Sequence, residues 1–589
     1  MQFRMTLFVA ACAFFAGIGA HAARSDEPYE DVIRTSAYVA VRDGTKLAVN
    51  VYRPAIDGVA VDEKLPVIFS ATPYRARYRD ESGEIVDMAL SDRHGMRSHI
   101  AHGYVVVTAD IRGKGASFGA RRGFQDRTEA MDHYDLIEWA AEQPWSDGNV
   151  GMTGCSYLGG ATMQAATVAP PHLKAVFVGA SDYDKYTFVR RGGIPAQFNT
   201  RPDEPLSVDL ASVPVDADKD GSQRDAAVAE HAGNTPMAAL WYGMPYRDSI
   251  SEFTGTKFWE EVGPYTYAET LKSSGIAYYF WSTWKDDPAE QVLLAARNLD
   301  GRLMMGPGNH CEPPPDMDLG EEARRFFDFH LKGEDTGIES EPRYKWWTLD
   351  APEGEVWKQS DAEPGAGVLR TKLALSQGES GTVASVNDGL LVAKGARKGE
   401  DAFRIDYSVG GKEYFPFWPA VLDEKGLTYT SAPLAEDVAM EGYPVVELVV
   451  SADREDAPIF VYLEEVAPDG TAENISFGRL LMSHRKLSEP PYDYAGLPWH
   501  SGNTADVSPV RPGKIYDITF ALTPSAKIFR AGHRIRVSIR GADPRQRNID
   551  EIAAEPAPEL TIYTGAKKSA VAIPFVEPPV FVKQQGDSG

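Results

Sequence analysis

The feature that most constrains the fold is an alternation of short apolar runs with helical patterns between residues 30 and about 180. The runs 46–52, 65–70, 104–110 and 149–154 are typical of strands. Two of them, 65–70 and 104–110, are almost continuously apolar, as strands buried on both faces are. The segments 128–142 and 157–169 have helical character. Strands alternating with helices predict a doubly wound parallel sheet.

Two changes of pattern along the chain predict the domain organisation. Residues 186–264 lose the strand pattern and become polar, with Asp-rich loops and aromatic clusters, which predicts an inserted helical cap. Strand patterns return at 276–281 and 302–305, and an amphipathic helix follows at 320–331. We therefore expect an α/β domain in two parts, 23–185 and 265–340. The length of 589 residues is itself too great for a single hydrophobic core.

The last part of the chain, residues 341–589, has a different pattern. Short strand-like runs recur there between Gly, Pro and Asp turns, at 444–450, 459–463, 515–522, 533–539 and 560–564. Helical periodicity fades over the same region. This pattern predicts an all-β sandwich or jelly roll as the C-terminal domain.

The N-terminus is typical of an exported protein. Arg4 precedes the apolar run 5–20, and Ala20-His21-Ala22 forms an A-x-A cleavage site. We expect residues 1–22 to be a removed signal peptide, so that the mature protein is periplasmic or secreted. A lipoprotein site at Cys12 is a weaker alternative, because the apolar run continues past it. No later stretch is apolar and long enough to predict a membrane span.

Charge and motif content exclude several classes of partner. A formal net charge of −25 disfavours nucleic acid and anionic membranes, because phosphate surfaces repel it. High acidity is also typical of a solubility adaptation in secreted proteins. The sequence has no H-E-x-x-H, clustered cysteines, Walker loop or G-x-G-x-x-G after a strand, so we expect neither a metal nor an organic cofactor. A homo-oligomer is compatible with the sequence.

The strongest local signal is the segment 151–160 (GMTGCSYLGG). An apolar strand ends at Gly154, Ser156 follows, and an Ala-rich helix begins at once. This order is typical of a nucleophile elbow, in which a tight turn lifts a serine hydroxyl above the sheet edge at a helix N-terminus. The generic pattern places glycine at 158, where this chain has Leu158 and then Gly159. A serine that only caps a helix is the alternative reading.

Further motifs occur in the order found in one enzyme family. They are residues 72–74 (TPY), 110–117 (DIRGKGAS), 143–152 (QPWSDGNVGM), 306–310 (GPGNH), 327–333 (FDFHLKG) and 531–539 (AGHRIRVSI). Together with the elbow, they resemble the cocaine esterase-like and X-prolyl dipeptidyl-peptidase-like serine hydrolases (CocE/NonD) over nearly all of the mature chain. The resemblance implies an α/β-hydrolase sheet with an inserted helical cap, followed by an all-β jelly-roll domain.

A catalytic triad follows from the elbow and the resemblance together. A serine hydroxyl needs a base to take its proton, and the base needs an acid to orient it. Ser156 is the predicted nucleophile, and His310 is the predicted base because it follows a strand-like run on a Pro/Gly loop. Similarity of residues 284–286 to the family's W-Y-D predicts Asp286 as the acid, with Asp287 as the alternative. The order Ser, acid, His is the one expected for this fold.

The oxyanion of the tetrahedral intermediate requires two preorganised donors. The N–H of Tyr157 is one, because it follows the nucleophile directly in an elbow. The resemblance implies the phenol of Tyr74 as the second. A buried aromatic side chain behind a Pro turn is the other interpretation of Tyr74.

The two cysteines that remain after signal cleavage flank the predicted catalytic residues, as Cys155-Ser156 and His310-Cys311. If the serine and histidine are hydrogen-bonded, their sequence neighbours lie close together. Some tannases and feruloyl esterases have this pattern with a disulfide clamping the active site, and this chain is similar to them there. We therefore predict a disulfide between Cys155 and Cys311; two free buried cysteines are the alternative.

The resemblance implies a small-molecule ester, amide or short peptide as the substrate. We favour an esterase or amidase acting on a small acyl compound. X-prolyl dipeptidyl peptidase or α-amino acid ester hydrolase activity is the alternative within the family. The latter enzymes bind the substrate ammonium with carboxylates in a D-x-E-D pattern that is missing here, which leaves Asp184, Asp287 and Glu290 as candidates. An alternative of another class is a non-catalytic carbohydrate-binding protein that uses the jelly roll.

Overall fold

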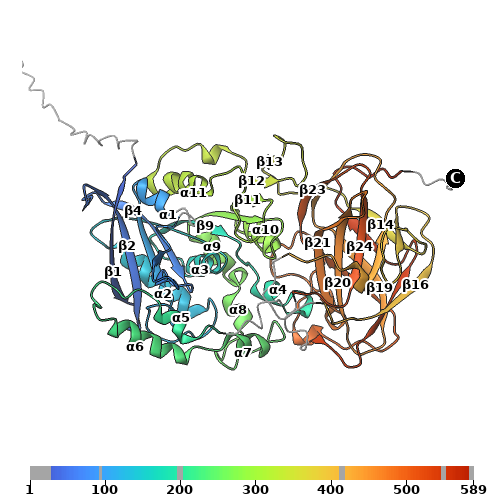
Figure 1. The fold of residues 1–589 in the computed structure, drawn as a ribbon, viewed down its shortest axis with the longest axis horizontal. Coiled ribbons are helices and arrows are strands. Elements are labelled where there is room, and N and C mark those ends of the chain that lie inside the picture. Colours follow the sequence, from blue (N-terminus) through green and yellow to red (C-terminus); the bar gives the residue numbers. More distant parts are fainter. Residues whose placement is uncertain (1–27, 92–95, 196–202, 410–417, 546–551, 583–589) are drawn as a thin grey trace, which may run out of the picture.

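The computed structural model describes residues 28–91, 96–195, 203–409, 418–545 and 552–582. The predicted signal peptide, residues 1–22 with Cys12, lies outside the described residues. Figure 1 shows two parts side by side: strands and helices of the first half of the chain, in blue to green, and a strand-rich part in orange to red. None of the helices in these ranges is long and apolar enough to cross a membrane.

The first part is built on a mixed sheet whose centre is parallel. Its strands run in the spatial order β1-β2-β7-β4-β8-β9-β10-β11-β12-β13. Their bounds are β1 (Asp31–Ala40), β2 (Lys46–Ile56), β4 (Leu65–Thr72), β7 (Val105–Asp110), β8 (Ser146–Cys155), β9 (Leu173–Gly179), β10 (Ala277–Thr283), β11 (Arg302–Gly306), β12 (Tyr344–Trp347) and β13 (Trp357–Ser360). Pairing is parallel from β7 to β12 and antiparallel at both edges. The predicted parallel sheet is therefore present only in the centre, and the edges are antiparallel. At the first edge, β1 and β2 are joined by a tight turn, a connection that only antiparallel strands can have.

Helices cover both faces of this sheet, as a doubly wound fold requires. The main ones are α1 (Met96–Ala101), α2 (Arg127–Ala141), α3 (Tyr157–Ala166), α10 (Ala289–Asn298) and α11 (Leu319–Phe327). Two glycines of β8 show the two faces: a Cβ on Gly154 would meet Leu158 of α3, and one on Gly151 would meet Phe327 of α11. Both helices therefore pack directly on the backbone of the strand that leads to Ser156.

The segment 186–264 is helical among its described residues. It contains most of α4 (Lys185–Val189), together with α5 (Leu206–Leu210), α6 (Ser222–Glu230), α7 (Met237–Tyr242) and α8 (Phe258–Val262). Buried aromatic side chains of α4, α7 and α8 form a separate apolar cluster that includes Tyr186, Trp241 and Trp259. Figure 1 shows α5 to α8, in green, along one side of the α/β part.

The second part is strand-rich. Its main sheet has the order β16-β25-β19-β26-β14-β15-β17-β24-β20-β21, with β22 beside β19 and a separate pair β18-β23. The bounds are β14 (Thr371–Ser376), β15 (Gly389–Val392), β16 (Gly399–Arg404), β17 (Leu427–Thr430), β18 (Val438–Gly442), β19 (Val445–Ala452), β20 (Pro458–Val466), β21 (Ala472–Leu481), β22 (Tyr516–Ala521), β23 (Ser525–Phe529), β24 (Arg534–Arg540), β25 (Glu559–Thr564) and β26 (Ala570–Ile573). It encloses its own apolar core. The predicted fold class, an α/β domain followed by a β domain, is confirmed.

Candidate active site

The turn between β8 and α3 has the geometry of a nucleophile elbow. Ser156 adopts φ 64° and ψ −125°, a backbone conformation that a residue with a side chain rarely adopts and that costs about 1–3 kcal/mol. The flanking glycines make the turn possible. A Cβ on Gly159 would lie 2.2 Å from the carbonyl oxygen of Gly179 on the next strand. The close approach therefore occurs at Gly159, which explains why the generic glycine at 158 can be replaced by leucine.

His310 and Asp286 come from loops after neighbouring parallel strands. Asp286 follows β10 and is fully buried, whereas His310 follows β11 and is partly exposed. Both carboxylate oxygens of Asp286 lie 2.9 Å from Nδ1 of the imidazole. Burial raises the pKa of the Asp286 carboxyl, and the imidazole opposes this shift. Asp287, the alternative acid, instead pairs with Arg545 at 3.2 Å.

The predicted site residues meet at one cavity. Ser156, His310, Tyr74 and Tyr157 all line a cavity of about 420 Å³ between the sheet edge and the cap. Phe124, Phe188, Leu206, Met237 and Trp241 supply its apolar wall. The structure thus places the serine, the imidazole and both predicted oxyanion donors at one surface that a small molecule can reach.

A disulfide joins Cys155 and Cys311, as predicted. Their Cα atoms are 6.0 Å apart, although 156 positions separate them in the sequence. One cysteine directly precedes Ser156 and the other directly follows His310. The covalent link therefore ties the loop of the imidazole to the elbow.

The 110–117 motif braces the loop that carries Tyr74. The carboxylate of Asp110, at the end of β7, accepts hydrogen bonds from the N–H groups of Ala76 (2.6 Å) and Ala116 (2.8 Å). Burial raises the pKa of Asp110 to about 6. A Cβ on Gly115 would collide with this carboxylate at 2.3 Å, so glycine is required there. The motif thus holds the backbone just after Tyr74, at Ala76.

Tyr74 itself is half exposed and packs edge-to-face on Tyr157, with ring centroids 6.2 Å apart. It is therefore not the buried aromatic of the other interpretation. The N–H of Tyr157 begins α3, where the helix macrodipole favours negative charge. Both groups thus lie at the cavity that Ser156 lines.

A buried polar network behind Tyr157 was not predicted from the sequence. The side-chain amide of Gln125 donates to the Tyr157 carbonyl at 2.7 Å and accepts from Lys185 at 2.6 Å. Lys185 also pairs with Asp182 at 2.6 Å. On the other side, the Tyr157 hydroxyl donates to Glu129 at 2.6 Å, and burial raises the pKa of Glu129 to about 8. These contacts span 3 to 60 positions, and no motif marks them.

The loop and first helical turn after β10 are held from the C-terminal domain. Lys285 pairs with Glu473 at 2.6 Å, and Asp287 pairs with Arg545. Glu290 accepts a hydrogen bond from Tyr494 at 2.6 Å. Both sequence neighbours of Asp286 are therefore fixed by residues more than 180 positions away, which settles which of the two adjacent carboxylates faces the imidazole.

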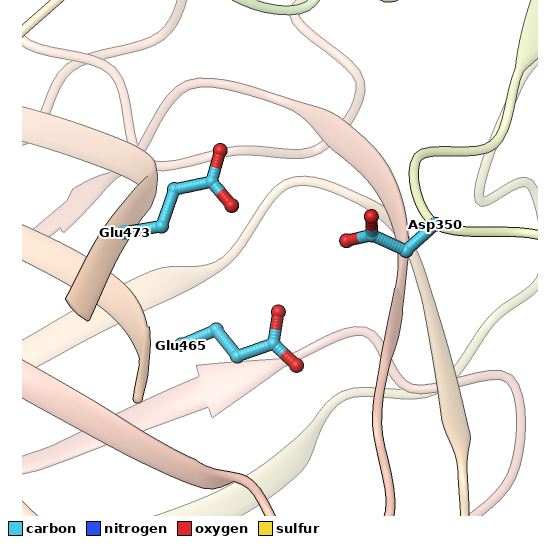
Figure 2. A group of neighbouring side chains, drawn as sticks. All are labelled: Asp350, Glu465 and Glu473. Carbon is cyan, nitrogen blue, oxygen red and sulfur yellow. The ribbon is translucent and has the colours of Figure 1, made fainter. Parts of the chain in front are cut away.

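Three carboxylates of the C-terminal half gather with the spacing of metal ligands. Figure 2 shows Asp350, Glu465 and Glu473 turned toward one another. The ammonium group of Lys527, whose side chain is 1% exposed, pairs with Asp350 and lies 2.8 Å from Glu465. Glu473 is 3.8 Å from the same nitrogen. A protein cation already compensates this cluster, so it is an ion-pair network rather than a ligand set.

Comparison with known proteins agrees with this architecture. Residues 43–312 match the family described as X-Pro dipeptidyl-peptidase (S15 family), and residues 336–554 match the X-Pro dipeptidyl-peptidase C-terminal non-catalytic domain. Among solved structures, a CocE/NonD family hydrolase from Staphylococcus aureus superposes with a TM-score of 0.68 at 20% identity, covering 93% of this chain and 94% of its own. An α-amino acid ester hydrolase superposes with a TM-score of 0.63 at 18% identity, covering 96% and 100%.

Curated relatives match along nearly the whole chain. A putative serine esterase of Mycobacterium bovis is 31% identical, over 93% of this chain and 96% of its own length. The cocaine esterase of a Rhodococcus strain is 23% identical over 87% and 91%. A putative Xaa-Pro dipeptidyl-peptidase of Streptomyces avermitilis is 23% identical over 97% and 88%. On the full-length match and the domain order together, the chain belongs to the S15 family of serine hydrolases, which unites serine esterases with X-Pro dipeptidyl-peptidases.

Proposed function

We propose that this protein is an exported serine esterase or amidase that cleaves small acyl compounds through an acyl-enzyme. The observation that carries the proposal is the contact of both Asp286 oxygens with Nδ1 of His310, at the cavity that Ser156 also lines. Export is supported by the N-terminal pattern of residues 1–22 and by the disulfide, a bond that persists in oxidising compartments.

The proposed mechanism assigns a role to each group. The carboxylate of Asp286 holds a proton on Nδ1 of His310, which leaves Nε2 as the base that takes the Ser156 proton. The serine oxygen attacks the acyl carbon, and the N–H of Tyr157 and the hydroxyl of Tyr74 stabilise the oxyanion. The imidazolium then protonates the leaving group. Water, activated by the same imidazole, hydrolyses the acyl-enzyme.

The charges around the cavity favour an uncharged acyl group. Each carboxylate that lines it among the described residues has a cationic partner: Asp182 pairs with Lys185, Asp203 with Arg121, and Glu204 and Asp209 share Lys114. A substrate ammonium would therefore compete with an existing ion pair at every one of them.

The sequence candidates for an ammonium site are also engaged elsewhere. Asp184 binds Arg247 at 2.8 Å, Asp287 binds Arg545, and Glu290 binds Arg191 at 2.6 Å. None of the three lines the cavity. This favours a simple acyl ester or amide over an α-amino acid ester or a dipeptide with a free N-terminus, both of which carry an ammonium group close to the reacting carbonyl.

Two measurements test the proposal. Labelling of the mature protein with a fluorophosphonate should modify one residue, Ser156, and S156A should remain unlabelled and inactive. Hydrolysis of p-nitrophenyl acyl esters should then be compared with hydrolysis of Ala-Pro-p-nitroanilide, with S156A as the blank. We expect kcat/KM to be higher for the neutral esters. Labelling that persists in S156A refutes the nucleophile assignment, and a preference for the dipeptide anilide refutes the substrate assignment.

A further inference from the structure

A second, smaller cavity lies between the cap and the C-terminal domain. Its volume is about 40 Å³, roughly three times what one water molecule needs. Arg190 and Arg191 line it from the cap, and Arg479 of β21 lines it from the other side. His484 and His500 complete its polar wall. Among the described residues that line it there is no carboxylate, so this part of the wall consists of cations and neutral groups.

Among the residues that line this cavity, Arg479 is a buried cation for which the described residues provide no direct partner. Its side chain is buried, at 4% exposure, and its Nε has no hydrogen-bond partner among the residues that the structure describes. Within the ranges that the structure describes, no carboxylate lies at ion-pair distance from its guanidinium. Burial lowers the pKa of Arg479 only to about 10, so the group is still cationic at neutral pH. A buried charge without a partner is strongly unfavourable unless something compensates it.

The carboxylates near Arg479 make their direct ion pairs with other arginines. Arg191 is paired with Glu290 at 2.6 Å, and Arg545 is paired with Asp287 and Asp543 at 3.2 and 2.9 Å. Each of these carboxylates already serves another guanidinium. The Arg479 guanidinium therefore has no direct ion-pair partner among the described residues, although Asp287 and Asp543 attract its charge from beyond contact distance.

Neutral donors face the same cavity. Burial lowers the pKa of His484 to about 4, so its ring is neutral at ordinary pH. The hydroxyl of Ser483 lies 3.0 Å from Nδ1 and can donate to it, which places the ring proton on Nε2. That nitrogen is buried and has no hydrogen-bond partner in the described part of the chain. A cation and an unused N–H donor thus meet in a space that holds more than one water.

We propose that this interdomain cavity is a binding site for a small oxyanion, such as inorganic phosphate, held by the Arg479 guanidinium and the Nε2 of His484. The planar guanidinium fork suits two oxygens of such an anion. The bound anion supplies the direct hydrogen-bond partner that the described residues do not give Arg479, and it links the cap to the C-terminal domain.

The site adjoins the catalytic cavity through one short helix. Lys185, Phe188 and Val189 of α4 line the catalytic cavity, and the next residues, Arg190 and Arg191, line the interdomain cavity. A Cβ on Gly192 would lie 2.3 Å from the Arg479 carbonyl oxygen, so the short 3-10 turn that follows α4 packs directly on β21. Oxyanion binding should therefore stabilise the wall of the catalytic cavity without contacting the substrate.

The test uses the mature full-length protein in a zwitterionic buffer. Ionic strength is held constant with gluconate, an anion too large for the cavity, while phosphate is raised. R479M removes the charge and keeps most of the side-chain volume. R530M, at an exposed arginine of the same domain that pairs with Asp437, is the matched control. Wild type and R530M should show a saturable rise in Tm of a few degrees, and R479M should show only the small, non-saturating rise that phosphate causes in any protein.

The stability of the two proteins without phosphate provides a second comparison. Without phosphate, R479M should be at least as stable as wild type, because it lacks the buried guanidinium that has no direct partner in the described ranges, and phosphate should favour wild type. Wild-type crystals soaked in arsenate should give an anomalous peak beside Arg479, a result that does not depend on the variant folding. Parallel Tm curves for wild type and R479M, or an arsenate soak with no peak in the cavity, would overturn the proposal.

Discussion

Breaking the bond between Cys155 and Cys311 should weaken both stability and catalysis. The disulfide closes a loop of 156 positions. In the chain-entropy account, restricting an unfolded loop of that length stabilises the folded protein by about 5 kcal/mol. Both cysteines are partly exposed, so a small-molecule reductant can reach them. We expect reduction, or replacement of both cysteines by alanine, to lower the free energy of unfolding by most of that amount.

The catalytic effect has a separate origin. Asp286 still contacts the imidazole in the variant, but His310 loses the covalent link between its loop and the elbow. A displacement of about 1 Å between reacting groups can reduce the rate by about 100-fold, so we expect a fall in kcat of about tenfold or more, with a smaller change in KM. Urea denaturation followed by fluorescence and steady-state ester hydrolysis measure the two effects.

Single replacements provide the control. C155A, C311A and the double variant should be equally affected, because each lacks the same bond, and reductant should change none of them further. If the three variants lose stability additively, or if reduced wild type keeps its full kcat, the reasoning about the clamp is wrong.

Two further variants test the site. D286N should lower kcat by about 10⁴-fold, as expected when a triad base loses its orienting acid. D287N should cause a much smaller loss, because Asp287 does not contact the imidazole and only anchors the loop through Arg545; similar losses in both would contradict the assignment of the acid. E129Q tests the buried carboxyl beneath Tyr157. Because burial raises the pKa of Glu129 from 4.5 to about 8, its contribution to stability is complete below pH 4.5 and is lost as the pH rises through 8. In urea denaturation, the free energy of unfolding of wild type should therefore fall relative to that of E129Q between pH 5 and 8. If the two free energies change in parallel with pH, the pKa of Glu129 is not raised.

Local signals predicted much of the fold, because they depend on short-range physics. The run 65–70 is apolar at almost every position, as a strand buried on both faces must be, and it forms β4. The strand β1 was missed because it lies at the sheet edge and most of its residues are exposed or half-buried, which leaves little apolar alternation to detect. Its place in the sheet comes from pairing with β2 rather than from its own composition.

In the candidate site, too, residues with a local sequence signal were predicted, and residues set by long-range contacts were not. Ser156 was recognisable because an elbow needs small neighbours next to the nucleophile. The choice between Asp286 and its neighbour stayed open, because the backbone there is set by Arg545, about 260 positions later. Gln125 and Glu129 carry no local signal either, since each acts through a contact with Tyr157 that only the folded chain creates.

The ion pairs between the C-terminal domain and the loop after β10 have a consequence for protein engineering. The domain matches a family called non-catalytic, and none of the proposed catalytic groups comes from it. Yet Glu473 and Arg545 anchor the residues on either side of Asp286. When the C-terminal domain is exchanged between relatives, both partners of each pair should therefore come from the same protein. A hybrid with mismatched partners keeps the triad residues, but the loop that positions Asp286 loses its contacts with the C-terminal domain.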